Sequence, residues 1–144
     1  MKMEANNIEE VIQGLDTIIT KAKDTNSRVG FFAALYRQVT LKIEQRISAG
    51  QFDNNVRMNE FATRFANRYF NALDAYRKGD KLPKAWKVTL EATEQTDLII
   101  VQHLLLGINA HVNFDLGIAT AQTSPGNELP SLRADFDRLN DILS

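Results

Sequence analysis

Apolar residues recur at three- and four-residue spacing along most of the chain, and no stretch alternates with a period of two. This spacing predicts helices and no strands. The helices predicted in this way span about residues 8–23, 28–49, 54–78, 83–90, 97–122 and 130–143. Their predicted caps, first-turn prolines and stop residues are Asn6 or Asn7, Ser27, Gly50, Asp53, Gly79, Pro83, Thr96 and Pro130.

The fifth predicted helix differs from the others because apolar side chains occupy almost every side of it. Its apolar positions are Leu98, Ile99, Ile100, Val101, Leu104, Leu105, Leu106, Ile108, Val112, Phe114, Leu116 and Ile118. A helix without a polar face is typical of the middle of a bundle. The sequence therefore predicts an all-α single domain over residues 1–144, with about six helices around a buried central helix at about 97–122.

Charge is scarce in this same segment. Charged residues make up 24% of the 144-residue chain, so residues 98–127 should carry about seven of them. They carry one, Asp115, together with both histidines of the chain, His103 and His111. The absence of cysteine excludes disulfides and thiolate metal ligands. Five polar side chains within residues 98–114 disfavour a lipid-facing helix, so a soluble cytoplasmic protein without a membrane partner is predicted.

The remaining charge is unevenly distributed along the chain. The net charge is −2 over residues 1–27, +7 over residues 28–87 and −6 over residues 88–144. The basic residues of the middle segment alternate with acids, and the isoelectric point of about 6.1 is far from the basic range typical of nucleic-acid-binding domains. We therefore expect the basic segment to pack beside the acidic one, and no nucleic-acid partner.

Two rows of residues stand out on the fifth predicted helix at 100° per residue. Gln102, Asn109 and Asn113 form one row, and four residues at steps of four form a ridge on another side, namely His103, Gly107, His111 and Asp115. Because a buried polar group needs a partner, both rows are expected to make polar contacts. Glycine costs a helix interior about 1 kcal/mol relative to alanine, so the glycine of the ridge predicts a close approach by a neighbouring helix, a ligand or a metal.

The ridge gives the first functional hypothesis, a buried polar pocket that binds a small ligand or a divalent metal and hydrolyses a substrate. His111 and Asp115 lie one turn apart, so an imidazole oriented by a carboxylate is the predicted catalytic pair. The predicted metal ligands are His103, His111 and Asp115. His103 lies about 12 Å from His111 along the axis, so a metal would need converging side chains or a second helix. The predicted ligand-binding residues are His103, Asn109, Asn113, Tyr36, Arg37 and Arg68.

The second hypothesis, from a different class, is a non-catalytic structural or oligomerisation domain. In it, His103, His111 and Asp115 belong to a satisfied polar network that fixes the register of the helix. Arg37 either belongs to a solvated ion pair on the surface or pairs with Asp115. Arg68 is a second candidate for pairing with Asp115. Tyr36 lies among the apolar positions of the helix predicted at 28–49, where a tyrosine most often packs in the core.

A resemblance to an uncharacterised, mostly bacterial family, catalogued only as a domain of unknown function, rests on four runs of the sequence. The runs are LYRQVT at 35–40, FANRY at 65–69, QHLLLG at 102–107 and NAHVNFDLGIA at 109–119, followed by Asp135, Phe136 and Asn140. The resemblance covers about residues 29–140. It implies an all-helical protein and carries over no activity or cofactor.

Members of the family that this chain resembles continue for another helical segment beyond the position of Ser144. If the chain is complete, the apolar side of the last helix, which holds Leu132, Phe136, Leu139 and Leu143, needs cover from another molecule. The resemblance therefore implies a homodimer through the C-terminal helix. If the chain is a fragment, part of the site belongs to the missing segment.

Overall fold

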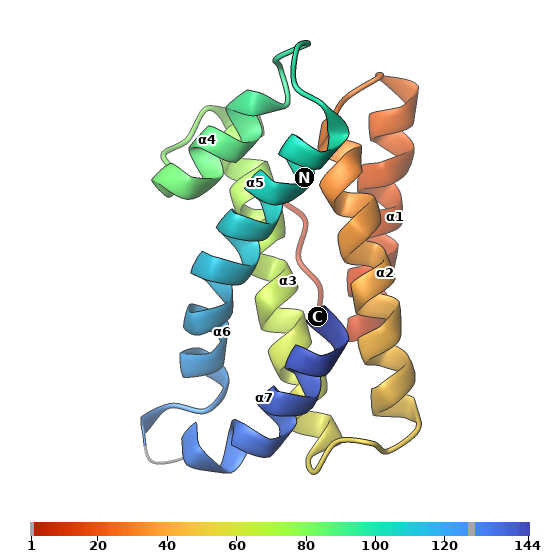
Figure 1. Ribbon diagram of the computed structural model, residues 1–144, viewed down its shortest axis with the longest axis vertical. Coiled ribbons are helices and arrows are strands. Elements are labelled where there is room, and N and C mark those ends of the chain that lie inside the picture. The colour runs from red at the N-terminus through yellow and green to blue at the C-terminus, as the bar shows by residue number, and fades with distance from the viewer. Residues whose placement is uncertain (1, 127–128) are drawn as a thin grey trace.

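All regular structure in the described part of the chain is helical, which confirms the predicted all-α class (Figure 1). The computed structural model describes residues 2–126 and 129–144. The helices are α1 (Ile8–Asp24), α2 (Val29–Ser48), α3 (Asn55–Lys78), α4 (Lys84–Ala92), α5 (Ile100–Ala110), the π-helical turn η1 (His111–Asp115), α6 (Leu116–Thr123) and α7 (Leu129–Leu143). Since α5, η1 and α6 follow one another without a break, the described residues form six helical rods.

The boundaries of α1 and α3 follow the cap signals in the sequence, whereas α5 begins at Ile100 and not directly after the predicted cap Thr96. The side chain of Asn7 accepts a hydrogen bond from the backbone N–H of Glu10 and so caps α1. The cap of α3 is Asn54, one residue after the predicted Asp53. Gly79 ends α3 with a φ of 76°, in the left-handed region that glycine adopts without steric cost.

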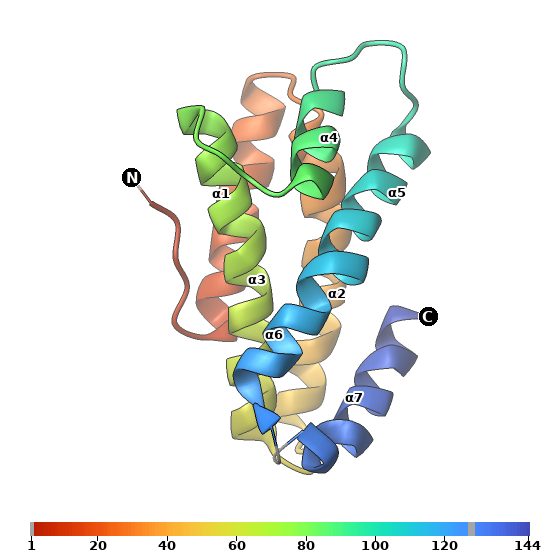
Figure 2. The same cartoon turned by 90° about the vertical axis from the view of Figure 1, so that its left-hand side faces the viewer.

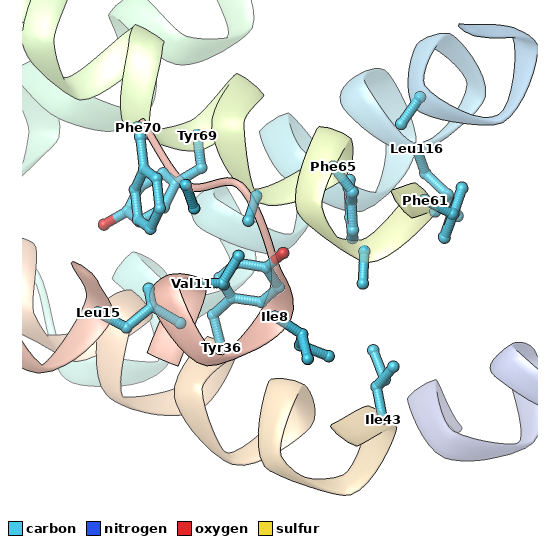
Figure 3. Packing of buried hydrophobic residues seen from close by; sticks show 14 of the residues in the cluster. Ile8, Val11, Leu15, Tyr36, Ile43, Phe61, Phe65, Tyr69, Phe70 and Leu116 are labelled. Atoms are coloured by element: carbon cyan, nitrogen blue, oxygen red, sulfur yellow. The ribbon is translucent and has the colours of Figure 1, made fainter. Parts of the chain in front are cut away.

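The central position of the bundle belongs to α3. Figures 1 and 2 show α3 between the α1–α2 pair and the rod formed by α5, η1 and α6, and α3 packs against α1, α2, α4, η1 and α6. Its buried residues are Met58, Phe61, Ala62, Thr63, Phe65, Ala66, Tyr69, Phe70, Ala72 and Leu73. They form the middle of the hydrophobic core, in which Tyr36 of α2 packs against Phe65 and Tyr69 of α3 (Figure 3).

The prediction of a buried central helix at about 97–122 is wrong. The rod over these residues lies at the edge of the bundle, where neighbouring helices cover only one side of it. Val101 is 56% exposed, Leu105 60% and Ile100 54%, although all three are apolar. Its α-helical part starts at Ile100 and is interrupted by η1, in which the N–H of Leu116 donates to the carbonyl of His111.

The last helix, α7, is covered by its own chain. Leu132, Leu139 and Ile142 of α7 are buried, and α7 packs against α2. The apolar side of this helix is therefore covered within the chain, which removes the argument for a homodimer through the C-terminal helix, while the homodimer itself stays a prediction. No helix in the described ranges is both long and apolar enough to span a bilayer.

Candidate polar site on the edge rod

Asp115, the last residue of η1, is the centre of a buried polar network. Its Oδ1 accepts a hydrogen bond from Arg68 Nε at 2.9 Å, and its Oδ2 accepts one from the Trp86 indole Nε1 at 2.9 Å. The same Oδ2 lies 3.0 Å from Nδ1 of His111. Three elements, α3, α4 and η1, therefore meet at one carboxylate. Burial of the charge is offset by one cation and two further donors.

The His111 ring is enclosed by aromatic side chains. The Phe65 ring stacks on it with centroids 3.8 Å apart and an interplanar angle of 2°, and the Tyr36 ring meets it edge-on at 4.5 Å. Rings of Phe32 and Trp86 also lie within 6 Å of the imidazole centroid. Only 1% of the residue is exposed, so the imidazole is part of the aromatic core and not of a solvent-filled pocket.

Burial decides the protonation of His111. It lowers the pKa of the imidazole, and the positive charge of Arg68 lowers it further, against the opposing effect of Asp115. The ring is therefore neutral at pH 7, with its proton on Nδ1, where the carboxylate accepts it. Its Nε2 is buried and has no hydrogen-bond partner among the described residues.

The ridge predicted from the sequence is the buried side of the rod, since His103, Gly107, His111 and Asp115 are all buried. At Gly107, a Cβ atom would lie 2.4 Å from a ring carbon of Phe32. The predicted close approach is therefore confirmed, and the approaching group is the side chain of a neighbouring helix.

His103 lies on the ridge but outside the network. Its ring contacts that of Phe31 at 5.7 Å, and neither of its ring nitrogens has a hydrogen-bond partner in the described part of the chain. Burial and the nearby charge of Arg28 lower its pKa. The hypothesis of a satisfied network that includes His103 is therefore wrong for this residue, while His111 and Asp115 do share a hydrogen bond.

The predicted ligand-binding residues are divided between the network and the surface. Arg68 contacts Asp115, whereas Arg37 pairs with Asp16 of α1, so the solvated ion pair is the correct alternative for Arg37. Asn109 and Asn113 lie on the exposed side of the rod, where the amide of Asn113 donates to that of Asn109 at 3.1 Å. They are not buried, because no helix covers that side.

Tyr36 packs in the core, as the second hypothesis expects, and burial raises the pKa of its hydroxyl above the ordinary value of 10. The predicted metal ligands do not form a metal-binding group, since the described residues contain no cluster of three or more His, Cys, Asp or Glu that could hold an ion. The catalytic role of His111 and Asp115 stays a prediction.

Sequence reasoning missed two members of the polar core. No sequence motif pointed to Trp86, although its indole N–H is one of the donors to Asp115. Asp135 of α7 is fully buried and accepts hydrogen bonds from the backbone N–H groups of Asp53 and Asn54 at the start of α3. Its signal was present, because Asp135 lies three residues after Leu132 and so on the apolar side of an amphipathic helix.

Lowering the pH from 7.5 to 5.5 is expected to reduce the free energy of unfolding. The pKa of His103 and of His111 is lowered by folding, so below about pH 6.5 the unfolded chain binds protons that the folded chain excludes. The stabilisation that results from the two lowered pKa values is complete above that pH. Below it, the free energy of unfolding decreases by at most about 1.4 kcal/mol per pH unit for each histidine. Urea unfolding at a series of pH values measures it.

The control is His103→Phe, which removes the contribution of His103 to the pH dependence of the free energy of unfolding. The chain has two histidines, so the slope between pH 7.5 and 5.5 should be smaller in this variant, and the remaining slope should come from His111. A wild-type stability that is constant over this range would contradict the neutral, buried state of both rings.

Comparison with known proteins gives a family and no function. A family of unknown function matches the chain over residues 8–144. Neither a curated protein nor a solved structure matches it. The family match spans every helix described above, including the polar network and the exposed side of α5.

Proposed function

Because the chain belongs to this family, DUF5995, and the family brings no activity, we propose from the structure that the protein is a non-catalytic domain that pairs with a second copy of itself through α5. The observation that carries this proposal is an apolar stripe on the exposed side of the edge rod. The stripe consists of Val101, Leu105, Ile108 and Val112, of which the first three are exposed and the last is partly buried. Contiguous apolar surface of this kind marks interaction sites in water-soluble proteins.

The spacing of the stripe favours another helix as its occupant. Its members lie four, three and four residues apart, which is the alternation of a coiled-coil seam. A helix from an identical chain has the same spacing, so two copies related by a twofold axis can interdigitate their side chains.

The absence of charge favours self-association over a partner of another kind. Residues 98–114 contain no charged side chain, so two copies meet without like-charge repulsion across the axis. The stripe also offers no charge that would select an acidic or basic partner. Since it covers only about three turns of helix, we expect a dimer that dissociates on dilution, because stable interfaces bury about 800 Å² on each partner.

In this proposal the network around Asp115 holds α5 in register. The carboxylate ties η1 to α3 and α4 through Arg68 and Trp86, and Thr89 of α4 donates a hydrogen bond to the carbonyl of Leu106 at 3.1 Å. These contacts fix the rotation of the rod about its axis, and therefore which side chains face outward. A buried polar residue that fixes register is a known device of helical assemblies.

Hydrolysis is the less supported alternative. A catalytic base must reach its substrate within hydrogen-bond distance, whereas His111 is 1% exposed and enclosed by aromatic rings. Both oxygens of Asp115 already accept hydrogen bonds. The buried, unpartnered Nε2 of His111 is the feature that keeps this alternative open.

Leu105→Glu is expected to convert the dimer into a monomer, with the dissociation constant raised at least tenfold. The substitution places a like charge from each copy near the twofold axis, where 60% of the residue is now exposed to solvent and would be buried by pairing. Sedimentation equilibrium at several protein concentrations measures the change. The matched control is Val56→Glu on α3, because Val56 is 82% exposed and lies outside the stripe.

A single introduced thiol provides a second test. The chain contains no cysteine, so Leu105→Cys forms a disulfide only with another molecule, and only where two Cα atoms come within about 7 Å. Rapid oxidation of Leu105→Cys to a covalent dimer, with slow oxidation of Val56→Cys, supports the proposal. A wild-type protein that remains monomeric at millimolar concentration, or equal behaviour of both positions, would overturn it.

A further inference from the structure

A cleft of about 260 Å³ lies next to the polar network, between α3 and the start of α4. Arg68, Lys81, Trp86 and Asp115 are among the residues that line it. The rest of the lining consists of the polar Asn71 and of Ala72, Ala75, Leu82 and Pro83. The cleft therefore combines an apolar wall with two cations.

The guanidinium of Arg68 is held in place at this cleft. Its Nε donates to Asp115 at 2.9 Å, and its Cζ lies 5.9 Å from the centroid of the Phe114 ring. Its side chain is 26% exposed, and its two terminal nitrogens have no hydrogen-bond partner among the described residues. Because Asp115 fixes the orientation through Nε, those two nitrogens are left as a pre-oriented fork for two oxygen atoms.

The charge at the cleft favours a ligand with one negative charge. The positive charge of Arg68 is matched by the carboxylate of Asp115, which faces Arg68, Trp86 and His111. Lys81 is exposed and makes none of the ion pairs found in the described part of the chain, so it supplies an unmatched positive charge. Between residues 77 and 87 the sequence has five basic residues and one acidic residue, which attracts anions to this face.

We propose that this cleft binds a small organic carboxylate, with its oxygens on the terminal nitrogens of Arg68, its charge near Lys81 and its short apolar body against Leu82 and Pro83. The inference does not rest on self-association through α5, because it uses a different face of the chain. A carboxylate fits better than a phosphate ester, since the wall is apolar and only one positive charge is unmatched. The cleft accommodates a body of a few carbon atoms.

Titration with 3-methylbutanoate tests the proposal, with fluorescence of the tryptophan as the signal. Trp86 is the only tryptophan of the chain and lines the cleft, so a bound ligand changes its surroundings. We expect a saturable change with 3-methylbutanoate and none with 3-methylbutanamide, which has the same shape without the charge. Inorganic phosphate tests whether any anion suffices.

Two variants and a control locate the site. Lys81→Ala removes an exposed charge without touching the core, and it is expected to raise the dissociation constant about tenfold. Arg68→Lys keeps the charge and removes the fork, with a loss of similar size. The control is Arg64→Ala, because Arg64 lies one turn earlier on α3 and pairs with Glu60.

Binding that is unchanged by Lys81→Ala would overturn the proposal, and this variant does not depend on the stability of the network. Equal binding of the amide would overturn it as well. Saturation by phosphate without saturation by the carboxylate would contradict the assigned ligand class.

Discussion

Replacing Asp115 by alanine is expected to lower the free energy of unfolding by about 3–5 kcal/mol. The carboxylate accepts hydrogen bonds from Arg68 and Trp86 and pairs with Nδ1 of His111. Its removal leaves the Trp86 and His111 donors without an acceptor in the core, and it leaves the partly exposed guanidinium of Arg68 without its counter-charge. Urea unfolding followed by circular dichroism measures the loss.

The matched control is Asp16→Ala. Asp16 also pairs with an arginine, Arg37, but the pair lies on the surface between α1 and α2. Exposed ion pairs contribute at most about 1 kcal/mol, so this variant should remain close to the wild type. If both variants lost the same stability, the carboxylate of Asp115 would not organise the three elements that meet at it.

Gly107→Ala is expected to be less stable than Gly117→Ala by about 2–3 kcal/mol, although both substitutions place alanine in a helix. At Gly107 the new Cβ would lie 2.4, 2.5 and 3.0 Å from three carbon atoms of Phe32. Phe32 cannot move freely, because its ring also contacts those of Tyr69 and His111. The overpacking therefore separates α5 from α2.

At Gly117 a Cβ would meet nothing within 4 Å. Alanine there gains about 1 kcal/mol of helix propensity, and Gly117→Ala should be more stable than the wild type. The difference between the two midpoints of thermal unfolding measures the cost of the contact with Phe32. A Gly107→Ala protein as stable as Gly117→Ala would show that α2 and α5 adjust without strain.

The candidate site was predicted in part from the sequence. The four-residue steps from His103 to Asp115 identified the buried side of the rod, because side chains four apart share a face of any α-helix. The same reasoning placed Asn109 and Asn113 in the interior, which is wrong. A helix that is apolar on all sides predicts cover on all sides, but nothing in its own sequence says how many neighbouring helices it has.

The partner of Asp115 shows the same limit. The sequence named Arg37 and Arg68 as candidates, and only the packing of α3 against η1 selects Arg68. Arg37 faces α1 instead and pairs with Asp16. Helical periodicity gives the face on which a side chain lies, but the contacts across that face depend on how the helices are arranged in space.

Four properties of this protein are predictable from its amino-acid sequence alone: the all-α class, the approximate helix boundaries, the close approach at Gly107 and the ridge that carries His111 and Asp115. These properties depend on spacing and on caps, which act within a few residues of one another. Only the packing of the helices shows that α3 is the central helix and that the rod from Ile100 to Thr123 lies at the edge with an exposed apolar stripe. Burial depends on neighbours that are far apart in the sequence, so two helices of the same apolar composition can lie one in a core and the other at an exposed edge.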